Sequence, residues 1–292
     1  MSDSLIVLGR KITNASDLKS VVRTMKAVAA ANVVQFQQAV QALDDYYRTV
    51  KMGLSVCFRE VDAADLNRGT GDGDVVGVIV FGSDQGLVGR FNEVVAEHVA
   101  ATLGDRAAQA EIWVIGERVY AELADAGLTP AGFFVVPNSI RSIPAVMTKL
   151  IIASEARGRR NISELLLFHN RPATGASYEP VDVRLLPLDG IWLREIAASR
   201  WLSKNLPEIA VDTVDTARAF IREYLFVSLF QACAESLASE NASRLAAMQR
   251  ADKNIDELLG ELRQTFSRQR QNGIDEELFD VIADFSTRNQ PL

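Results

Sequence analysis

The sequence predicts an α/β protein in which a long antiparallel coiled coil of N- and C-terminal helices carries a central Rossmann-like α/β domain. Three observations predict it: a proline-free helical seam at the start, alternating strand and helix patterns in the middle, and a longer helical seam at the end. Neither long helix can bury its apolar stripe alone, so we expect them to pair, with the α/β domain as a cap at the closed end. The expected divisions are 1–52, 53–207 and 208–292.

Composition excludes several function classes. The chain has 292 residues, is 48% apolar and carries a net charge of −7, which disfavours nucleic-acid binding. The two cysteines, Cys57 and Cys233, form no CxxC motif. Because no apolar run approaches the ~18 residues of a membrane span, we expect a soluble, cytosolic protein.

The first helical seam contains no proline, and its apolar or small residues recur every three or four positions. At 1.5 Å per residue, a helix over 5–50 would be about 68 Å long. The seam consists of Leu5, Leu8, Ile12, Ala15, Leu18, Val22, Met25, Ala29, Val33, Phe36, Val40, Leu43, Tyr47 and Val50.

After a turn at 69–74, the middle segment alternates continuous apolar runs with amphipathic runs. This alternation predicts a small, mostly parallel sheet. About eight residues separate the last two strands, too few for a crossover, so we expect them to form an antiparallel hairpin. The expected strands are 75–81, 111–116, 132–137, 163–169 and 179–188, and the expected helices are 87–103, 117–127 and 144–156.

The C-terminal seam keeps its period from Ala217 to Phe266, which is typical of a coiled coil. Its small members Ala234, Ala238 and Asn241 allow close approach of a second helix. Because this helix is the longer one, up to about 40 Å of it could project past its partner. We expect the projecting side chains Leu278, Ile282 and Phe285 to be exposed, which implies an enclosing partner.

Motifs that could carry chemistry are sparse. The run "FGSDQGLVGRF" places three glycines between a strand and a helix, but it matches no phosphate-loop spacing, so we expect a tight turn with Asp84 capping the following helix. His98 and His169, read as a helix-surface residue and a strand end, lie too far apart in sequence to suggest a metal site. The acidic run at 275–280 is typical of a helix start. We expect no catalytic, cofactor or metal site.

One C-terminal stretch resembles the signature of the F-type ATP synthase gamma subunit family, the central rotor stalk. The family pattern Ser-Glu-x-x-x-Arg-Met-x-Ala-Met-x-x-Ala-x-x-Asn, followed by Arg-Gln-x-x-Ile, corresponds here to Ser239, Glu240, Arg244, Leu245, Ala247, Met248, Ala251, Asn254, Arg270, Gln271 and Ile274.

Two weaker matches occur in the right order. "RKI" (10–12) with "TMKAVAAAN" (24–32) resembles the family's first helix, and "SDQGLVGRFN" (83–92) resembles its loop after the first strand. The chain departs from the family pattern at Asn32, where the family has Lys, at positions within 83–92, and at Asp275. These departures suggest a divergent branch, such as the alternate, sodium-linked F-type enzymes.

The resemblance implies a non-catalytic rotor subunit that couples rotation of an ion-driven membrane ring to ATP synthesis or hydrolysis. The implied partners are the alpha and beta subunits, an epsilon-type subunit and the ring, at the cytoplasmic face of the cell inner membrane, without a membrane span. The expected partner-contact residues are Met25, Lys26, Ser239, Glu240, Arg244, Met248, Arg270 and Gln271.

The resemblance also suggests why "SENASRLAAMQRADKN" (239–254) is so rich in small residues. We expect it to pack closely against Ala27–Ala31 of the first helix and to turn inside a ring of partners. Two other classes stay open: a Rossmann-like enzyme or nucleotide-binding protein with helical oligomerisation arms, and a coiled-coil tether without a motor role.

Antiparallel pairing predicts that Met25 lies near Arg244 to Met248. Cysteines introduced at Ala27 and beside Leu245 should therefore form a disulfide within one chain, which requires Cα atoms about 4.4–6.8 Å apart. The measurement is non-reducing gel electrophoresis at low protein concentration. Crosslinks that form only between chains would contradict the pairing.

Overall fold

The computed structural model describes residues 3–59, 75–157, 162–174, 177–199, 201, 205, 207–209 and 212–288. The expected turn at 69–74 lies outside these ranges. The chain forms two compact units, which are considered separately: Ala30–Arg244, and Met1–Ala29 together with Leu245–Leu292. Two long helices, α1 (Asp3–Cys57) and α7 (Thr213–Arg288), run through both units.

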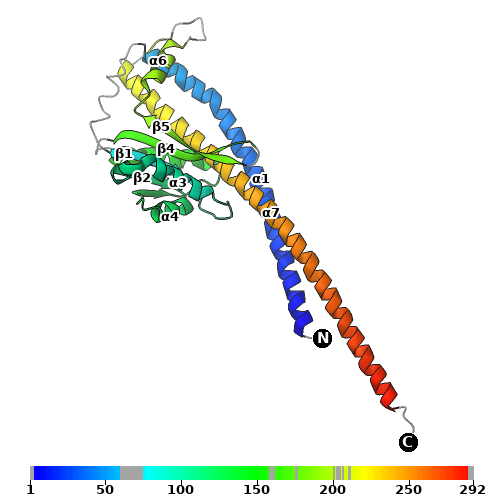
Figure 1. Cartoon of the computed structure of the whole chain (residues 1–292). Helices are drawn as coiled ribbons and strands as arrows, with labels where there is room; N and C mark the ends of the chain where they lie inside the picture. Colours follow the sequence, from blue (N-terminus) through cyan, green and yellow to red (C-terminus); the bar gives the residue numbers. More distant parts are fainter. Residues whose placement is uncertain are drawn as a thin grey trace. The chain divides into compact units, whose positions relative to one another are not determined.

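The Ala30–Arg244 unit contains a five-stranded sheet in the order β3-β2-β1-β4-β5. Pairing is parallel from β3 through β4, and β5 runs antiparallel to β4, which confirms the expected mostly parallel sheet with a final hairpin (Figure 1). The strands are β1 (Val75–Phe81), β2 (Ala110–Ile115), β3 (Gly132–Phe134), β4 (Ile162–Pro172) and β5 (Tyr178–Leu186).

Shorter helices connect these strands. The helix expected from residue 87 begins at Phe91 instead, because Leu87 and Gly89 have φ angles of 63° and 61° and cannot continue a right-handed helix. The helices are α3 (Phe91–Leu103), α4 (Glu117–Asp125), α5 (Ile143–Arg157) and α6 (Gly190–Ala198), with short 3₁₀ helices at Gly104–Gln109 and Ile140–Ser142.

Alternate side chains of the sheet enter two different cores. Val78 and Val80 of β1 point to one face, where they pack with α3 and α4. Ile79 and Phe81 point to the other face, where they pack with α5 and with residues of α1 and α7. The two long helices therefore supply part of one covering layer of the sheet (Figure 1). This corrects the expectation that the α/β domain caps their closed end: the sheet packs against their side.

The closed end of the helical pair is covered by α6, a helix that the sequence analysis missed. Ile196 of α6 is buried with Val50, Leu54 and Val227 of the two long helices. Trp192 lies 4.8 Å from the Tyr224 ring, centroid to centroid. The side chain of Asp189 caps α6 by accepting a hydrogen bond from the Ile191 amide at 2.9 Å.

In the other unit, residues 3–29 of α1 pair antiparallel with the second half of α7. Near the start of α1, the Ser4 hydroxyl donates to the Gln269 side chain at 2.7 Å. Near its other limit, the Lys26 ammonium donates to Asp252 at 2.6 Å. A narrow core lies between them, made by Ala15, Val22, Met248, Ile255 and Leu259.

The length of the projecting helix differs from the expectation. Residues 270–288 of α7 follow the Ser4–Gln269 contact, which corresponds to about 28 Å rather than 40 Å at 1.5 Å per residue. The difference arises because α1, with 55 residues, is longer than the sequence pattern indicated.

Ala238 offers a test of the packing between α7 and the sheet. Its side chain is 1% exposed and belongs to the core beneath β1 and β4. Ala238→Trp should lower the free energy of unfolding by about 1–3 kcal/mol, because the added ring overpacks this core. Urea denaturation followed by circular dichroism measures the change. Gln41→Trp, at an exposed position of α1, is the control, and equal tolerance at both sites would contradict the packing.

Candidate functional site

The segment of α7 from Ala232 to Asn241 is buried at every position. A helix at a protein surface normally exposes one polar face, so complete burial means that neighbours surround this helix. Small side chains are required because structure approaches from all directions at once. The expected packing against α1 accounts for only one of these faces.

The loop after β1, residues 83–92, covers one further face of α7. The Ser243 hydroxyl donates to the Val88 carbonyl at 2.6 Å, and Ser243 is buried. The loop is fixed from within, because the Ser83 amide donates to the Asn92 side chain at 2.9 Å. The glycine-containing motif therefore forms a tight turn that rests on a helix.

Asp84 caps a different helix from the one expected. One carboxylate oxygen accepts a hydrogen bond from the Glu117 amide at 3.0 Å, at the start of α4, and the other accepts from the Val136 amide at 2.9 Å. The expectation that Asp84 caps the helix directly after it in sequence was wrong. Asp84 instead connects the segment after β1 to the start of α4 and to the segment after β3.

Strand β4 contacts a third face of α7 through a buried histidine. His169 is 2% exposed and its Nε2 atom lies 2.8 Å from a carboxylate oxygen of Glu235. Arg171 Nε donates to the same oxygen at 3.2 Å, and the Gln231 amide donates to the other at 2.9 Å. His169 thus lies within the strand and pairs with α7, which corrects its interpretation as a simple strand end.

These contacts control the ionisation of Glu235. Burial alone would raise the pKa of this carboxyl group. The bonds from His169 and Gln231, with the charge of Arg171, outweigh burial and lower the pKa below its ordinary value. Glu235 therefore stays ionised, and it joins the sheet to α7 through charge-assisted hydrogen bonds.

Glu240, one turn further along, is in the opposite situation. Arg244 donates to its Oε1 atom at 2.7 Å, and their side chains are 7% and 11% exposed. Burial raises the pKa of Glu240 despite Arg244, and the nearby charge of Asp84 raises it further. The pair is therefore buried within the chain.

This arrangement occupies the position where a Rossmann-like enzyme binds its ligand, outside the carboxyl ends of the parallel strands. Three polar residues near these strand ends already have partners within the chain: Asp84 and His169 as described above, and Asn138, which accepts a hydrogen bond from the Ser142 hydroxyl at 3.4 Å. Among the described residues, no group of three His, Cys, Asp or Glu side chains could hold a metal ion.

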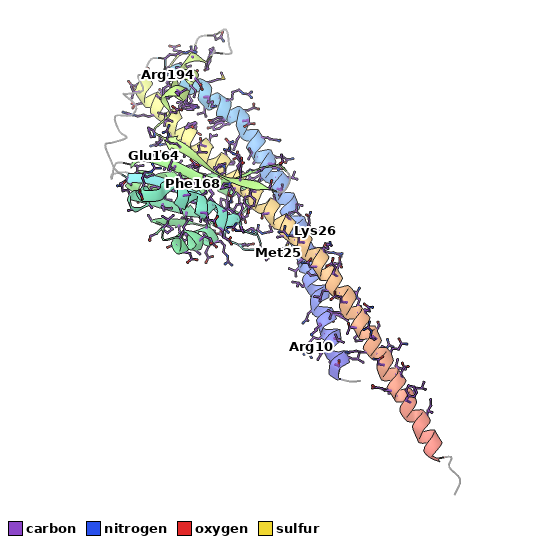
Figure 2. All side chains as sticks on the ribbon, viewed as in Figure 1. Arg10, Met25, Lys26, Glu164, Phe168 and Arg194 are labelled. Carbon is purple, nitrogen blue, oxygen red and sulfur yellow. The ribbon has the colours of Figure 1, made fainter. Side chains whose placement is uncertain are left out.

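The eight predicted partner-contact residues differ in how accessible they are. Ser239, Glu240, Arg244 and Met248 are buried within the chain. Met25 and Lys26 on α1, which are labelled in Figure 2, are partly buried, and Lys26 is bonded to Asp252. The remaining two, Arg270 and Gln271, are exposed. Contact with partner subunits stays a prediction for all eight residues.

Beyond Gln271, α7 carries large apolar side chains that are exposed. Leu278 and Ile282 are 57% and 54% exposed, as expected, and Ile274 and Phe279 are similarly accessible. The side chain of Phe285 lies outside the described residues. None of the described helices contains an apolar stretch that could span a membrane.

Comparison with known proteins identifies the family. The family model described as ATP synthase matches residues 4–287. The chain belongs to the ATP synthase family. Its relatives in this family include the ATP synthase gamma chains of Bartonella bacilliformis, 27% identical over 96% of this chain and 98% of the relative, and of Clavibacter michiganensis subsp. michiganensis, 26% identical over 97% of each.

Solved structures of the family share the fold. A chain of the Euglena gracilis mitochondrial ATP synthase OSCP/F1/c-ring structure aligns with a TM-score of 0.66 at 15% identity, covering 99% of this chain and 97% of that one. A chain of the rotor from the same organism's enzyme aligns with a TM-score of 0.61 at 16% identity, covering 93% and 99%. The predicted gamma-subunit resemblance and fold class are confirmed. The divergent branch stays a prediction.

Sequence reasoning missed several long-range pairs in each unit. Glu235 and Ser243 in one unit, and Asp252 and Asp256 in the other, each pair with a residue far away in the sequence, and no local pattern marks such pairs. Asp252 gave a faint signal, because it is a charged residue in an apolar seam, and such residues are expensive to bury unless paired.

The opposite environments of Glu240 and Glu235 predict opposite pH dependence. Because the folded-state pKa of Glu240 is raised, its contribution to stability is present below the unfolded pKa near 4.5 and is lost as pH rises through the folded value. Glu240→Gln should therefore gain in Tm relative to the wild type between pH 5 and pH 8. Thermal unfolding measured across this range tests it.

Glu235→Gln is the matched control. Its lowered pKa means that its contribution is present above about 4.5 and is lost only as pH falls through the folded value. Ionisation of Glu235 itself therefore adds no change to the Tm difference from pH 5 to pH 8. A constant Tm difference for Glu240→Gln over this range would contradict the raised pKa of Glu240.

Proposed function

We propose that the chain is the central-stalk rotor subunit of an F-type ATP synthase, coupling ion-driven rotation of a membrane ring to ATP synthesis or hydrolysis in the surrounding subunits. The observation that carries the proposal is helix α7. Over 76 continuous residues, it is buried at 232–241 and ends in a segment that exposes large apolar side chains. A rotating shaft requires both features: a part that is fixed within its own domain and a part that is exposed for contact with other subunits.

The chemistry takes place outside this chain. The alpha and beta subunits surround the helical pair and make or split ATP, while the α/β domain seats on the ring with an epsilon-type subunit. Names of similar proteins support these partners: the curated relatives are ATP synthase gamma chains, and a Tetrahymena thermophila central stalk/c-ring structure aligns with a TM-score of 0.57 over 79% of this chain.

An asymmetric shaft can bias several identical neighbours differently. At any angle, the helical pair presents a different face to each catalytic subunit, so its contact free energy differs among them. A partner shifts a conformational equilibrium only by its differential affinity for the states, and here the rotor angle sets that difference. Rotation therefore changes in turn which subunit is open and which is closed.

Accessibility divides the predicted contact residues between two roles. Arg270, Gln271, Met25 and Lys26 retain exposed surface and contact the alpha and beta subunits. Ser239, Glu240, Arg244 and Met248 act from inside the chain, by holding α7 in place.

Location and domain roles follow from these partners. The divisions 1–52, 53–207 and 208–292 then correspond to first shaft helix, ring-seating domain and second shaft helix. The complex lies at the cytoplasmic face of the cell inner membrane, where this subunit is peripheral.

Arg270 and Gln271 provide the test. Arg270→Ala with Gln271→Ala should leave assembly intact, because each lost charge-assisted hydrogen bond is worth about 1.5–3 kcal/mol. Cooperative ATP turnover and ion pumping per ATP should fall, because the difference between rotor angles becomes smaller. Both rates are measured on the same assembled preparation.

The chain contains a matched control for this variant. Arg263 and Gln264 form the same dipeptide one heptad earlier on α7, and both are exposed. Arg263→Ala with Gln264→Ala removes identical groups from the same helix face. Equal turnover and coupling in the two double variants would remove Arg270 and Gln271 from the contact set.

A further inference from the structure

The final part of α7 continues as an exposed helix beyond the start of α1. The hydrogen bond from Ser4 to Gln269 lies near the beginning of α1, and α7 extends past it (Figure 1). Residues 270–272 and 274–279 are all exposed. A helix in this setting gains little from packing, so its own sequence decides how well it holds together.

Gly273 interrupts this exposed part of α7. A Cβ atom added there would meet no heavy atom within 4 Å, so close packing does not require a glycine. The backbone at Gly273 is helical, so the conformation does not require one either. Glycine weakens a helix interior relative to alanine, because it loses more backbone freedom. The helix is therefore locally weak at a position where no contact demands it.

The residues around Gly273 carry the signals of one helix ending and another beginning. Arg268 and Arg270 precede it, and cations are favourable in the last turn of a helix. Asn272 is a preferred N-cap residue, and the acidic run at 275–277 is favourable in a first turn. These preferences are satisfied only if helix ends exist here, and a continuous helix has none.

The apolar stripe of α7 also changes direction at Gly273. Before this glycine the stripe consists of Ile255, Leu259, Leu262 and Phe266. After it the stripe consists of Ile274, Leu278 and Ile282. At 100° per residue, the second stripe lies about 130° around the helix from the first. The two parts of α7 therefore direct their apolar faces toward different neighbours.

Gly260, the preceding glycine of α7, shows what Gly273 lacks. A Cβ atom at Gly260 would likewise meet nothing within 4 Å. Its neighbour Leu259 is buried, however, and Leu262 packs against the same core with α1, so packing holds the helix on both sides of Gly260. In the sequence, no pair of opposite charges spaced by three or four residues spans the Asn272–Gly273 bond.

We infer that Asn272–Gly273 is a hinge at which α7 breaks and re-forms. The structure holds the continuous state. In the broken state the segment 274–288 stays helical, its acidic first turn occupies a helix N-terminus, and its apolar stripe turns to fit a partner without disturbing the pairing of α1 with α7. The inference does not depend on the proposed rotor function, because all of its evidence lies within this chain.

Amide hydrogen exchange on the full-length chain, resolved to single residues by mass spectrometry, tests the hinge. Breaking α7 at this point removes the hydrogen bonds of amides 273–276, whose acceptors precede Gly273. We expect a minimum of protection at 273–276, with slower exchange on both sides. Gly273→Ala should slow exchange of these amides about fivefold, which corresponds to a difference in helix propensity of about 1 kcal/mol at 1.4 kcal/mol per tenfold.

Gly260→Ala is the matched control, because it makes the same change in the same helix. It should leave exchange at 273–276 unchanged. Since alanine favours the helix more than glycine does, neither variant is expected to lose its fold.

The direction of the segment is measured with spin labels at Glu257→Cys and Ile282→Cys, both exposed positions. The native cysteines are buried, so labelling is confined to the new sites. A continuous helix separates these positions by about 38 Å along its axis. Pulsed electron paramagnetic resonance should show this distance together with shorter ones in the labelled parent. Gly273→Ala should remove the shorter distances, and Gly260→Ala should keep them.

Two outcomes would overturn the inference. Exchange that rises steadily from residue 270 to the end of α7 would indicate fraying of a continuous helix in place of a hinge. An exchange pattern or a distance distribution that Gly273→Ala leaves unchanged would show that Gly273 does not control where the helix breaks.

Discussion

The structure depends on one constraint: a single stretch of α7, residues 232–241, must pack on every side at once. It is the partner of α1 in the helical pair and also part of the layer that covers the sheet. Small side chains suit both requirements, because the neighbouring backbones approach from several directions. Alanine and serine supply five of its ten residues, and a Trp side chain in place of Ala238 would not fit.

Complete burial also explains the polar residues in this segment. A buried carboxylate is tolerated only where cations and hydrogen-bond donors surround it. Glu235 meets this condition through His169, Arg171 and Gln231, and Glu240 meets it through a hydrogen bond from Arg244. Such contacts have direction, so they fix the helix in rotation and translation against the sheet.

Much of the fold could be predicted from the sequence because it follows local periodicity. The continuous apolar run at 75–81 and the three-four repeat of Leu5 to Val50 each depend on residues that are neighbours in the chain. Helix α6 was missed because its apolar side chains pack against Val50, Leu54 and Val227 of the long helices, which are distant in the sequence. The assignment of Asp84 failed because Leu87 and Gly89, with positive φ, delay the next helix and leave the carboxylate free to cap α4.

The candidate site was less predictable, because its decisive contacts join distant parts of the chain. His169 and Glu235 are 66 residues apart, and Lys26 and Asp252 are 226 apart. Hydrophobic periodicity identifies one apolar face of a helix. It cannot show that distant parts of the chain cover the other faces. The family signature did select Ser239, Glu240 and Arg244, but it did not reveal that they are enclosed by their own chain.

The most direct test of the rotor role is to observe rotation. Asp105→Cys places a unique accessible thiol on the α/β domain, because Asp105 is exposed and both native cysteines are buried. A probe attached there is followed by single-molecule microscopy in assembled complexes whose alpha and beta subunits are fixed to a surface. The account predicts that added ATP drives rotation of the probe in one direction. A probe that stays at a fixed angle while the same complexes hydrolyse ATP at full rate would contradict it.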